Sequence, residues 1–366
     1  MADVTHRDED AVDTWNVIMS EYLSSLAYLN GKPKAQGKLK VKHEDFCVSE
    51  NLSFEPSGYG EHLMLRIRKT GENTSFVANE LAKACGVKSR DVSWAGLKDR
   101  HAVTEQWFSI YLPKSESPDL SLFLTRYPQI EILKTTRHHK KIRPGDLDGN
   151  EFTVVISEVT DVKDVVQRLE KIARNGVPNY FGSQRFGHGG NNLIEARRWG
   201  RENVRTRNAQ KRSLYLSAAR SWIFNTIVSA RVEQEILNLA LLGDIVKRDQ
   251  ELVSVTKENI GNINHELLQG FGQVTAAMAG DNSLPTEADA FILEQPYLDA
   301  EGDLMSLIRG NRMQHDRRSC ILIPQDLRWS THEKSVTLHF SLTSGSFATS
   351  IVRELVTEIQ VERTYK

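Results

Sequence analysis

The residues best suited to chemistry in this sequence lie in one short charged run. Asp99 stands there between Lys98 and Arg100, within the stretch WAGLKDRHAVTEQ that covers residues 94–106. Nearby opposite charge favours the ionised form of a carboxyl group even where the group is partly buried. An ionised aspartate could serve as a nucleophile or as a general base. The alternative is a solvated turn with a surface ion pair, which the composition of the run alone favours.

Apolar residues on both sides of this run predict two strands that would position the aspartate. Segments 92–97 and 103–110 are rich in valine, tryptophan and other apolar residues, a composition typical of strands. We therefore expect Asp99 in a charged loop at the edge of a sheet. Side-chain alternation around Asp99 predicts that its neighbours Lys98 and Arg100 face outward.

Hydrophobic periodicity predicts further elements around this loop. Strands are expected at 39–48, 63–67 and 152–159, and helices at 12–28, 74–85 and 162–174. Thr74 is a candidate cap for the second of these helices, and Gly86 is its stop. Because strands and helices interleave without regular βαβ alternation, the pattern indicates an α+β fold with a mixed or antiparallel sheet.

The second half of the chain differs in its pattern and indicates a second domain. From about residue 176 the apolar residues follow longer helical periods, including 213–232 and a leucine-rich stretch at 232–242, and strand-like segments return only near 336–342. A chain of 366 residues also exceeds the roughly 250 to 300 residues at which a single core stops growing. This pattern is the one expected of a helical insertion within a sheet domain.

The charged run closely resembles the catalytic signature of the TruD family of tRNA pseudouridine synthases, Gly-x-Lys-Asp-Arg/Lys-x-Ala-x-Thr. The catalytic aspartate of that signature falls on Asp99. Four more stretches resemble elements of the family and follow in its order: residues 40–50 (KVKHEDFCVSE), 149–153 (GNEFT), 177–187 (VPNYFGSQRFG) and 345–355 (GSFATSIVREL). Five ordered elements across most of the chain make a chance resemblance very improbable. One departure is His43, where the family has a proline, and it affects only the local turn.

The resemblance implies a pseudouridine-synthase catalytic domain that carries an inserted, more helical domain specific to the family, with the substrate in the cleft between the two. On this basis we expect the catalytic domain at residues 1–175 and 323–366. The inserted TruD-specific domain is then expected at residues 176–322.

The resemblance also assigns roles to individual residues of the expected uridine pocket. Chemistry on a nucleobase requires the base to leave its stack, and aromatic faces with a few polar groups hold such a base. An asparagine offers both a donor and an acceptor to a uracil edge. Taken singly, each phenylalanine is more typical of a core. By resemblance, the pocket is lined by Phe46, Asn150 and Phe347, Phe152 packs nearby, and Lys40 pairs with Asp99 and keeps it ionised.

The near-neutral net charge of −1 conceals a segregation of charges along the chain. Basic residues gather at 134–143 and at 197–212, whereas acidic residues gather at 281–303. Such segregation can give a nearly neutral protein one basic face that holds a phosphate backbone. A solvated helix face is the alternative for either basic block taken alone. The candidate contacts to an RNA backbone are Lys140, Lys141, Arg143, Arg205 and Lys211.

Several other protein classes lack support in the sequence. No apolar run reaches the roughly 18 residues that span a bilayer, and the acidic N-terminus does not resemble a secretory signal. Cys47, Cys85 and Cys320 are far apart without CxxC spacing, so neither a disulfide framework nor a zinc ribbon is indicated, and a reducing cytoplasm fits best. No motif predicts a metal site, and no dinucleotide or phosphate-loop fingerprint predicts a nucleotide cofactor.

The resemblance finally implies a cofactor-free isomerase that converts a uridine of tRNA to pseudouridine, at position 13 of the D-stem. The N1–C1′ bond breaks, the uracil turns within its pocket, and C5 joins C1′. Asp99 would attack C1′ as a nucleophile or assist the departure of uracil through a glycal-like path, and the sequence leaves both routes open. We expect tRNA as partner, no membrane, and a monomer. A noncatalytic tRNA-binding or RNA-chaperone module on the same fold is the competing hypothesis.

Overall fold

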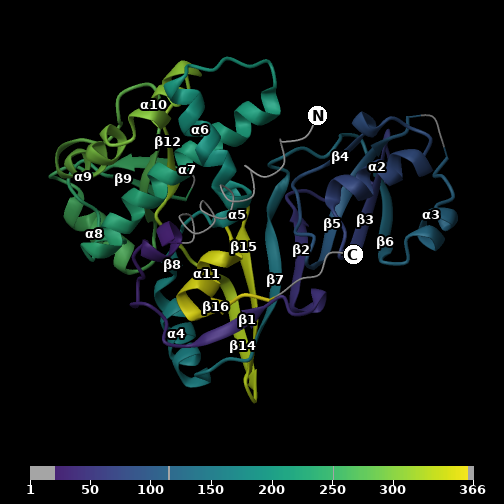
Figure 1. Ribbon diagram of the computed structural model, residues 1–366, viewed down its shortest axis with the longest axis horizontal. Helices are drawn as coiled ribbons and strands as arrows, with labels where there is room; N and C mark the ends of the chain where they lie inside the picture. The colour runs from purple at the N-terminus through teal and green to yellow at the C-terminus, as the bar shows by residue number, and fades with distance from the viewer. Residues whose placement is uncertain (1–20, 114–115, 250, 362–366) are drawn as a thin grey trace, which may run out of the picture. The chain divides into compact units, whose positions relative to one another are not determined.

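The computed structural model describes residues 21–113, 116–249 and 251–361 (Figure 1). These residues form two compact units. Unit 1 comprises the described residues 21–32, 175–322 and 349–354. Unit 2 comprises the described residues 33–174, 323–348 and 355–361.

Unit 2 is built on a ten-stranded mixed sheet whose central order is β14-β15-β7-β2-β5-β3-β6. Its pairs are antiparallel except β2 with β5 and β1 with β16. The strands are β1 (Gln36–Leu39), β2 (Phe46–Leu52), β3 (His62–Thr70), β4 (Val92–Trp94), β5 (Val103–Tyr111), β6 (Ile130–His138), β7 (Leu147–Ser157), β14 (Gln325–His332), β15 (Ser335–Thr343) and β16 (Thr357–Ile359). The helices are α2 (Thr74–Ala84), α3 (Ser121–Arg126) and α4 (Val162–Asn175). This mixed sheet with helices is the α+β architecture that the pattern predicts.

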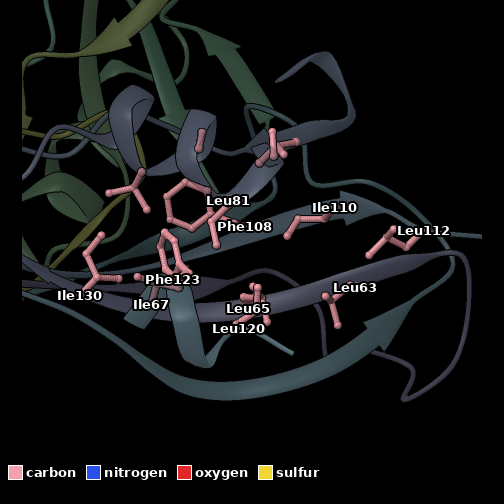
Figure 2. Close-up of a cluster of buried hydrophobic side chains, with 14 residues drawn as sticks. Leu63, Leu65, Ile67, Leu81, Phe108, Ile110, Leu112, Leu120, Phe123 and Ile130 are labelled. Carbon is pink, nitrogen blue, oxygen red and sulfur yellow. The ribbon is translucent and has the colours of Figure 1, made fainter. Parts of the chain in front are cut away.

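Helix α2 packs on β3 and β5 and closes the main apolar core of unit 2 (Figure 2). The core forms because β3 alternates along its length, so that Leu63, Leu65 and Ile67 share one face of the sheet. Asn73 caps the helix, its side chain accepting a hydrogen bond from the Ser75 N–H. The prediction of Thr74 as the cap was therefore wrong by one residue, and the Thr74 side chain is buried instead.

The strand predicted at 39–48 is interrupted in the structure. β1 ends at Leu39, Lys40 takes a left-handed backbone conformation with φ of 54°, and a 3₁₀ turn at His43–Asp45 precedes β2. The Asp45 carboxylate accepts a hydrogen bond from the Lys42 N–H and stabilises this turn. The predicted strands at 92–97 and 103–110, with the loop between them, and the predicted helix at 162–174 are confirmed, with differences only at their ends.

Unit 1 combines helices with a second sheet, of order β10-β9-β11-β12. Its described elements are β8 (Val177–Pro178), α5 (Ser183–Phe186), α6 (Asn191–Arg201), α7 (Ala209–Glu233), β9 (Ile245–Arg248), β10 (Glu251–Ser254), α8 (Ile260–Leu268), β11 (Gln273–Met278), α9 (Ala288–Asp299), α10 (Gly302–Gly310), β12 (Asp316–Ser319), β13 (Ile321–Leu322) and most of α11 (Ala348–Leu355). The expectation that strands return only near 336–342 was wrong, and no helix covers 232–242 beyond Glu233. The central strand β11 reads QVTAAM and is buried on both faces, so it carries no alternating pattern to detect.

Residues 21–32 group with unit 1, whereas the sequence analysis placed them in the catalytic domain. The Tyr22 ring stacks on Trp222 of α7 with ring centroids 3.5 Å apart, and Leu26 is buried. Residues 21–25 are helical, and the rest of the predicted helix up to residue 20 lies outside the described residues. Most of α11 also groups with unit 1, where the Ser350 hydroxyl donates to the Tyr180 carbonyl at 2.8 Å.

Gly149 provides a test of how closely β7 and β15 pack in unit 2. A Cβ atom at this position would lie 2.2 Å from the Leu342 carbonyl oxygen. We expect Gly149→Ala to destabilise unit 2 by about 1–3 kcal/mol through forced displacement of the neighbouring strand. Calorimetric unfolding measures the effect, and Gly261→Ala on α8, where a Cβ meets nothing within 4 Å, is the control. A transition in the Gly149 variant as high as that of the wild type would contradict this packing.

Candidate active site

Figure 1 labels strands β4 and β5. Asp99 lies in the loop between these two strands, where the sequence predicts it. Its carboxylate forms an ion pair with the Lys40 ammonium, and both side chains are largely buried, 18% and 14% exposed. The second carboxylate oxygen accepts a hydrogen bond from the His101 N–H at 2.9 Å. Burial alone would raise the pKa of Asp99, but the Lys40 ammonium and the His101 N–H outweigh it, so this pKa lies below its ordinary value. The carboxylate is therefore ionised at neutral pH.

Buried polar side chains from neighbouring elements hold the main chain of this loop. The Thr74 hydroxyl accepts a hydrogen bond from the Lys98 N–H at 3.0 Å. The same hydroxyl donates to the Gln106 side-chain oxygen at 2.9 Å, and the Gln106 amide donates to the Gly96 carbonyl at 3.3 Å. Thr74 and Gln106 are fully buried. Helix α2 and strand β5 thus fix the residues that precede Asp99.

The Lys98 side chain is buried, which corrects the prediction that it faces outward. Its ammonium forms an ion pair with Glu50 of β2, whose side chain is completely buried. Burial raises the pKa of the Glu50 carboxyl, and the Lys98 ammonium and the Trp107 N–H oppose that increase. Alternation failed as a guide because the loop has no strand geometry. Arg100 is exposed as predicted, and its Nε donates to the Gly71 carbonyl at 3.3 Å.

A third lysine, Lys69 at the end of β3, contacts the same loop. Its ammonium donates to the Asp99 carbonyl oxygen at 3.2 Å and to the Glu72 carbonyl oxygen at 2.7 Å. The residue is completely buried, and this burial lowers the pKa of Lys69 to about 8. The loop at Asp99 is therefore held by charged groups from two strands.

These groups share one face of the sheet, which we call the inner face and define by Val48, Thr104, Lys69, Phe152 and Phe340. In the register of the sheet, Val48 lies opposite both Thr104 and Phe152, Thr104 lies opposite Lys69, and Phe152 lies opposite Phe340. Residues directly opposite each other point to the same face. The loop with Asp99 is attached to this face through its bonds to Lys69 and Glu50.

The inner face presents aromatic rings next to the ion pair. The Lys40 ammonium lies 4.2 Å from the centre of the Phe46 ring. Phe46 meets Phe152 edge to face with centroids 6.1 Å apart, and Phe152 stacks on Phe340 at 5.3 Å. Phe46 and Phe152 are both buried. The structure thus brings together Asp99, Lys40 and Phe46, with Phe152 behind them.

Asn150 lies on the inner face of β7, opposite Glu50 on one side and Leu342 on the other. Its side-chain oxygen is buried and has no hydrogen-bond partner among the residues that the structure describes. A buried acceptor without a donor is unfavourable by about 1–3 kcal/mol. An external donor that reaches this oxygen would remove the penalty.

Phe347 is half-buried and directly precedes α11. It follows the end of β15, where Thr343 lies opposite Gly149, and the Ser344 N–H donates to the Asp148 carbonyl at 3.0 Å. These contacts place the turn that carries Phe347 beside the segment that begins with Gly149.

The candidate RNA contacts differ in their surroundings. Lys140, Lys141 and Arg143 of unit 2 are exposed, as are Arg205 and Lys211 of unit 1. Arg205 donates to the Gly310 carbonyl. Much of the second basic block is neutralised locally, because Arg197, Arg198 and Arg201 pair with Glu301, Glu195 and Asp303.

No metal ligand set accompanies this site in the described part of the chain. Among those residues, no group of three or more histidine, cysteine, aspartate or glutamate side chains could hold a metal ion. Cys47, Cys85 and Cys320 are free thiols. No helix within the described ranges is long and apolar enough to cross a membrane.

Comparisons with known proteins identify the family of this chain. The family model described as tRNA pseudouridine synthase D (TruD) matches residues 23–195 and 191–355. The chain belongs to the TruD family. It is 66% identical over 347 residues to tRNA pseudouridine synthase D of Vibrio parahaemolyticus, which covers 95% of this chain and 100% of the relative. The corresponding protein of Aliivibrio salmonicida is 59% identical over 349 residues, with 95% and 100% coverage.

A solved structure from Methanosarcina mazei, described as a tRNA pseudouridine synthase D, has the same fold as this TruD-family chain. The two superpose with a TM-score of 0.70 over 90% of this chain and 95% of that one, at 23% identity. The predicted α+β fold of the TruD family is thereby confirmed.

Sequence reasoning missed the four buried polar residues that hold the loop: Glu50, Lys69, Thr74 and Gln106. A signal for one of them, Lys69, was present. Lys69 continues the alternation of Leu63, Leu65 and Ile67, a position at which an apolar residue is expected. A charged residue at a core position of a strand indicates a buried interaction that only the fold can identify.

The ion pair of Lys98 and Glu50 allows a direct test of the loop anchor. We expect Glu50→Ala to destabilise unit 2 by about 3–5 kcal/mol, because it leaves the Lys98 ammonium buried without a counter-charge. Glu131→Ala is the matched control, because Glu131 pairs with Arg68 at the surface, and its loss should change stability by about 1 kcal/mol or less. Calorimetric unfolding compares the two variants. Equal small effects would show that the buried pair does not anchor the loop.

Proposed function

We propose that this chain converts a uridine of tRNA to pseudouridine, with Asp99 as the catalytic residue. The observation that carries the proposal is the ionised Asp99 carboxylate, paired with Lys40 beside the Phe46 ring. A carboxylate in this state is ready to act on the sugar of a nucleoside whose base meets the aromatic side of the site.

In the proposed reaction the Asp99 carboxylate attacks C1′ of the flipped uridine, and the N1–C1′ bond breaks. Uracil leaves with the bonding electrons as an anion. It turns within the pocket, C5 then attacks C1′, and the carboxylate departs. Loss of the proton from C5 and protonation of N1 by water then complete pseudouridine, so the reaction consumes no cofactor. The Lys40 ammonium keeps Asp99 ionised before the attack and lies close to the charge that develops.

We propose that the Asn150 side chain recognises the edge of the uracil by hydrogen bonds. Its unpartnered oxygen could accept the N3–H of uracil, while its amide group donates to a carbonyl oxygen of the base. A base that fills this site satisfies a buried acceptor for which the described residues supply no donor. Phe46 and Phe347 would meet the faces of the flipped base, with Phe152 supporting Phe46.

The finer features of the substrate are proposed from the resemblance to the family. We assign the modified uridine to position 13 in the D-stem of tRNA. Lys140, Lys141, Arg143, Arg205 and Lys211 are the proposed contacts to the phosphate backbone, and their exposure suits that role. We propose residues 1–175 and 323–366 as the catalytic domain and residues 176–322 as the inserted TruD-specific domain. We further propose that the chain acts as a monomer in the cytoplasm.

Release of tritium from tRNA that carries 5-tritiated uridine tests the reaction and its catalytic residue together. Forming the C5–C1′ bond expels the hydrogen at C5, so we expect release with the wild type. Asp99→Asn should abolish release while the affinity for tRNA stays within about twofold, because the substitution removes the anion and little volume. Tight binding without release by the wild type would favour the noncatalytic RNA-binding module instead.

Phe347 and Lys211 should affect different steps of the same reaction. We expect Phe347→Ala to lower the single-turnover rate with little change in affinity for tRNA, because its proposed role is to stack on the flipped base and not to hold the phosphate backbone. Lys211→Ala should weaken binding, reduce the slope of log affinity against log salt by about one, and leave the rate at saturation unchanged. Filter binding across a salt series and single-turnover assays measure the two effects. Loss of affinity alone in both variants would contradict this division.

A further inference from the structure

Lys69 is a buried charged residue that has no role in the proposed reaction as described above. It is completely buried on the inner face, in line with Leu63, Leu65 and Ile67 of the apolar core. Within the described ranges no carboxylate lies within ion-pair distance of its ammonium, which instead donates to the carbonyl oxygens of Asp99 and Glu72. Burial of a charge with no carboxylate in contact with it is strongly unfavourable. A residue that only fills this space would not need to carry a charge.

We propose that Lys69 is a positioning residue for the isomerisation: it fixes the main chain of Asp99 and adds a buried positive charge beside the reacting carboxylate. This inference rests on the proposed function. Lys40 holds the Asp99 side chain, whereas Lys69 holds its carbonyl group, so the two lysines restrain the residue from both ends. Catalysis by a positioned carboxylate is sensitive to displacements of about 1 Å.

The hydrogen-bond geometry explains why a lysine suits this position. One ammonium group reaches two carbonyls that are far apart in the chain, Glu72 after β3 and Asp99 before β5. It thereby joins the segment that leads into α2 to the loop that carries the candidate nucleophile. A methionine would match the volume but would leave both carbonyls without this donor.

The charge balance of the site gives Lys69 a second effect. The buried groups around the loop comprise three ammonium groups, Lys40, Lys69 and Lys98, and two carboxylates, Glu50 and Asp99. These five groups sum to one positive charge when Lys69 is protonated, and the half-buried Glu72 side chain lies outside this set. Departure of uracil creates one negative charge, and a fixed positive charge in a site shielded from water stabilises it. Neutral Lys69 would retain its hydrogen bonds but lose this contribution.

Lys69 loses its proton within the pH range in which the rate of isomerisation can be measured. Burial lowers the pKa of Lys69 to about 8, with Lys98 acting in the same direction, while Asp99, Glu72 and Glu50 oppose it. We therefore expect the rate of isomerisation to fall as the pH rises through about 8. Folding stability should change in the opposite direction. The unfolded chain binds a proton at its ordinary lysine pKa of 10.5, so between about 8 and 10.5 the contribution of Lys69 to stability increases with pH.

The test compares Lys69→Met with the wild type in single-turnover tritium release, tRNA binding and amide hydrogen exchange of residues 97–102. We expect the rate at pH 7 to fall by about tenfold or more, affinity for tRNA to change by about twofold or less, and exchange in the loop to accelerate. The decline in rate above pH 8 should be absent in the variant. Lys171→Met is the matched control, because Lys171 is an exposed lysine on α4 and its loss should change none of these quantities.

Three outcomes would overturn the inference: a normal rate in Lys69→Met, a loss of rate that follows a loss of affinity, or an unchanged decline above pH 8. If the variant does not fold, the wild type alone decides, because a flat rate between pH 7 and 9.5 contradicts a role for the charge. Failure of the proposed function is distinguishable from these outcomes. In that case the wild type releases no tritium at any pH, while exchange of the loop amides still reports whether Lys69 positions Asp99.

Discussion

The site depends on one ion pair, between Lys40 and Asp99, which forms outside regular secondary structure. Lys40 has a left-handed backbone at the end of β1, and Asp99 lies in the loop before β5. Burial raises the pKa of the Asp99 carboxyl group. The Lys40 ammonium lowers this pKa again, because the two side chains are held at contact distance. The sheet beneath supplies the restraint, since β2, β3 and β5 each contribute a buried polar side chain that bonds to the loop.

The three lysines around the loop differ in their electrostatic tasks. Lys98 is matched by Glu50, so that pair is internally neutral and acts as an anchor. Lys40 is matched by Asp99 until the carboxylate reacts, and Lys69 has only carbonyl partners among the described residues. Under the proposed mechanism, attack by Asp99 on C1′ removes the negative charge of the carboxylate and transfers it to uracil. The lysine that was paired with the nucleophile then becomes available to the leaving group without any movement of the protein.

The local parts of this arrangement could be predicted from the sequence, whereas the long-range parts could not. Apolar periodicity predicts the strand–loop–strand around Asp99 and the helix at 162–174, because burial imposes a repeat on neighbouring residues. The buried orientation of Lys98 depends on Glu50, which is 48 residues away in the sequence. The interruption after Leu39 depends on one residue with positive φ, and the strands of unit 1 are short or buried on both faces. None of these leaves a periodic signal.

The inner face is divided into a charged part and an aromatic part. This division suits a reaction in which the base is detached from its sugar and then joined to the same sugar through another atom. The proposed nucleophile, Asp99, is restrained at its side chain, at its carbonyl group and at the preceding residue. These restraints hold the carboxylate in one position relative to C1′, both when it attacks and when it departs. The uracil must instead turn, and flat rings such as Phe46 permit rotation in their plane without loss of contact. Asn150 can exchange donor and acceptor roles along the edge of the turning base. Rigid polar restraints on the sugar side and a smooth aromatic surface on the base side are therefore complementary requirements of one isomerisation.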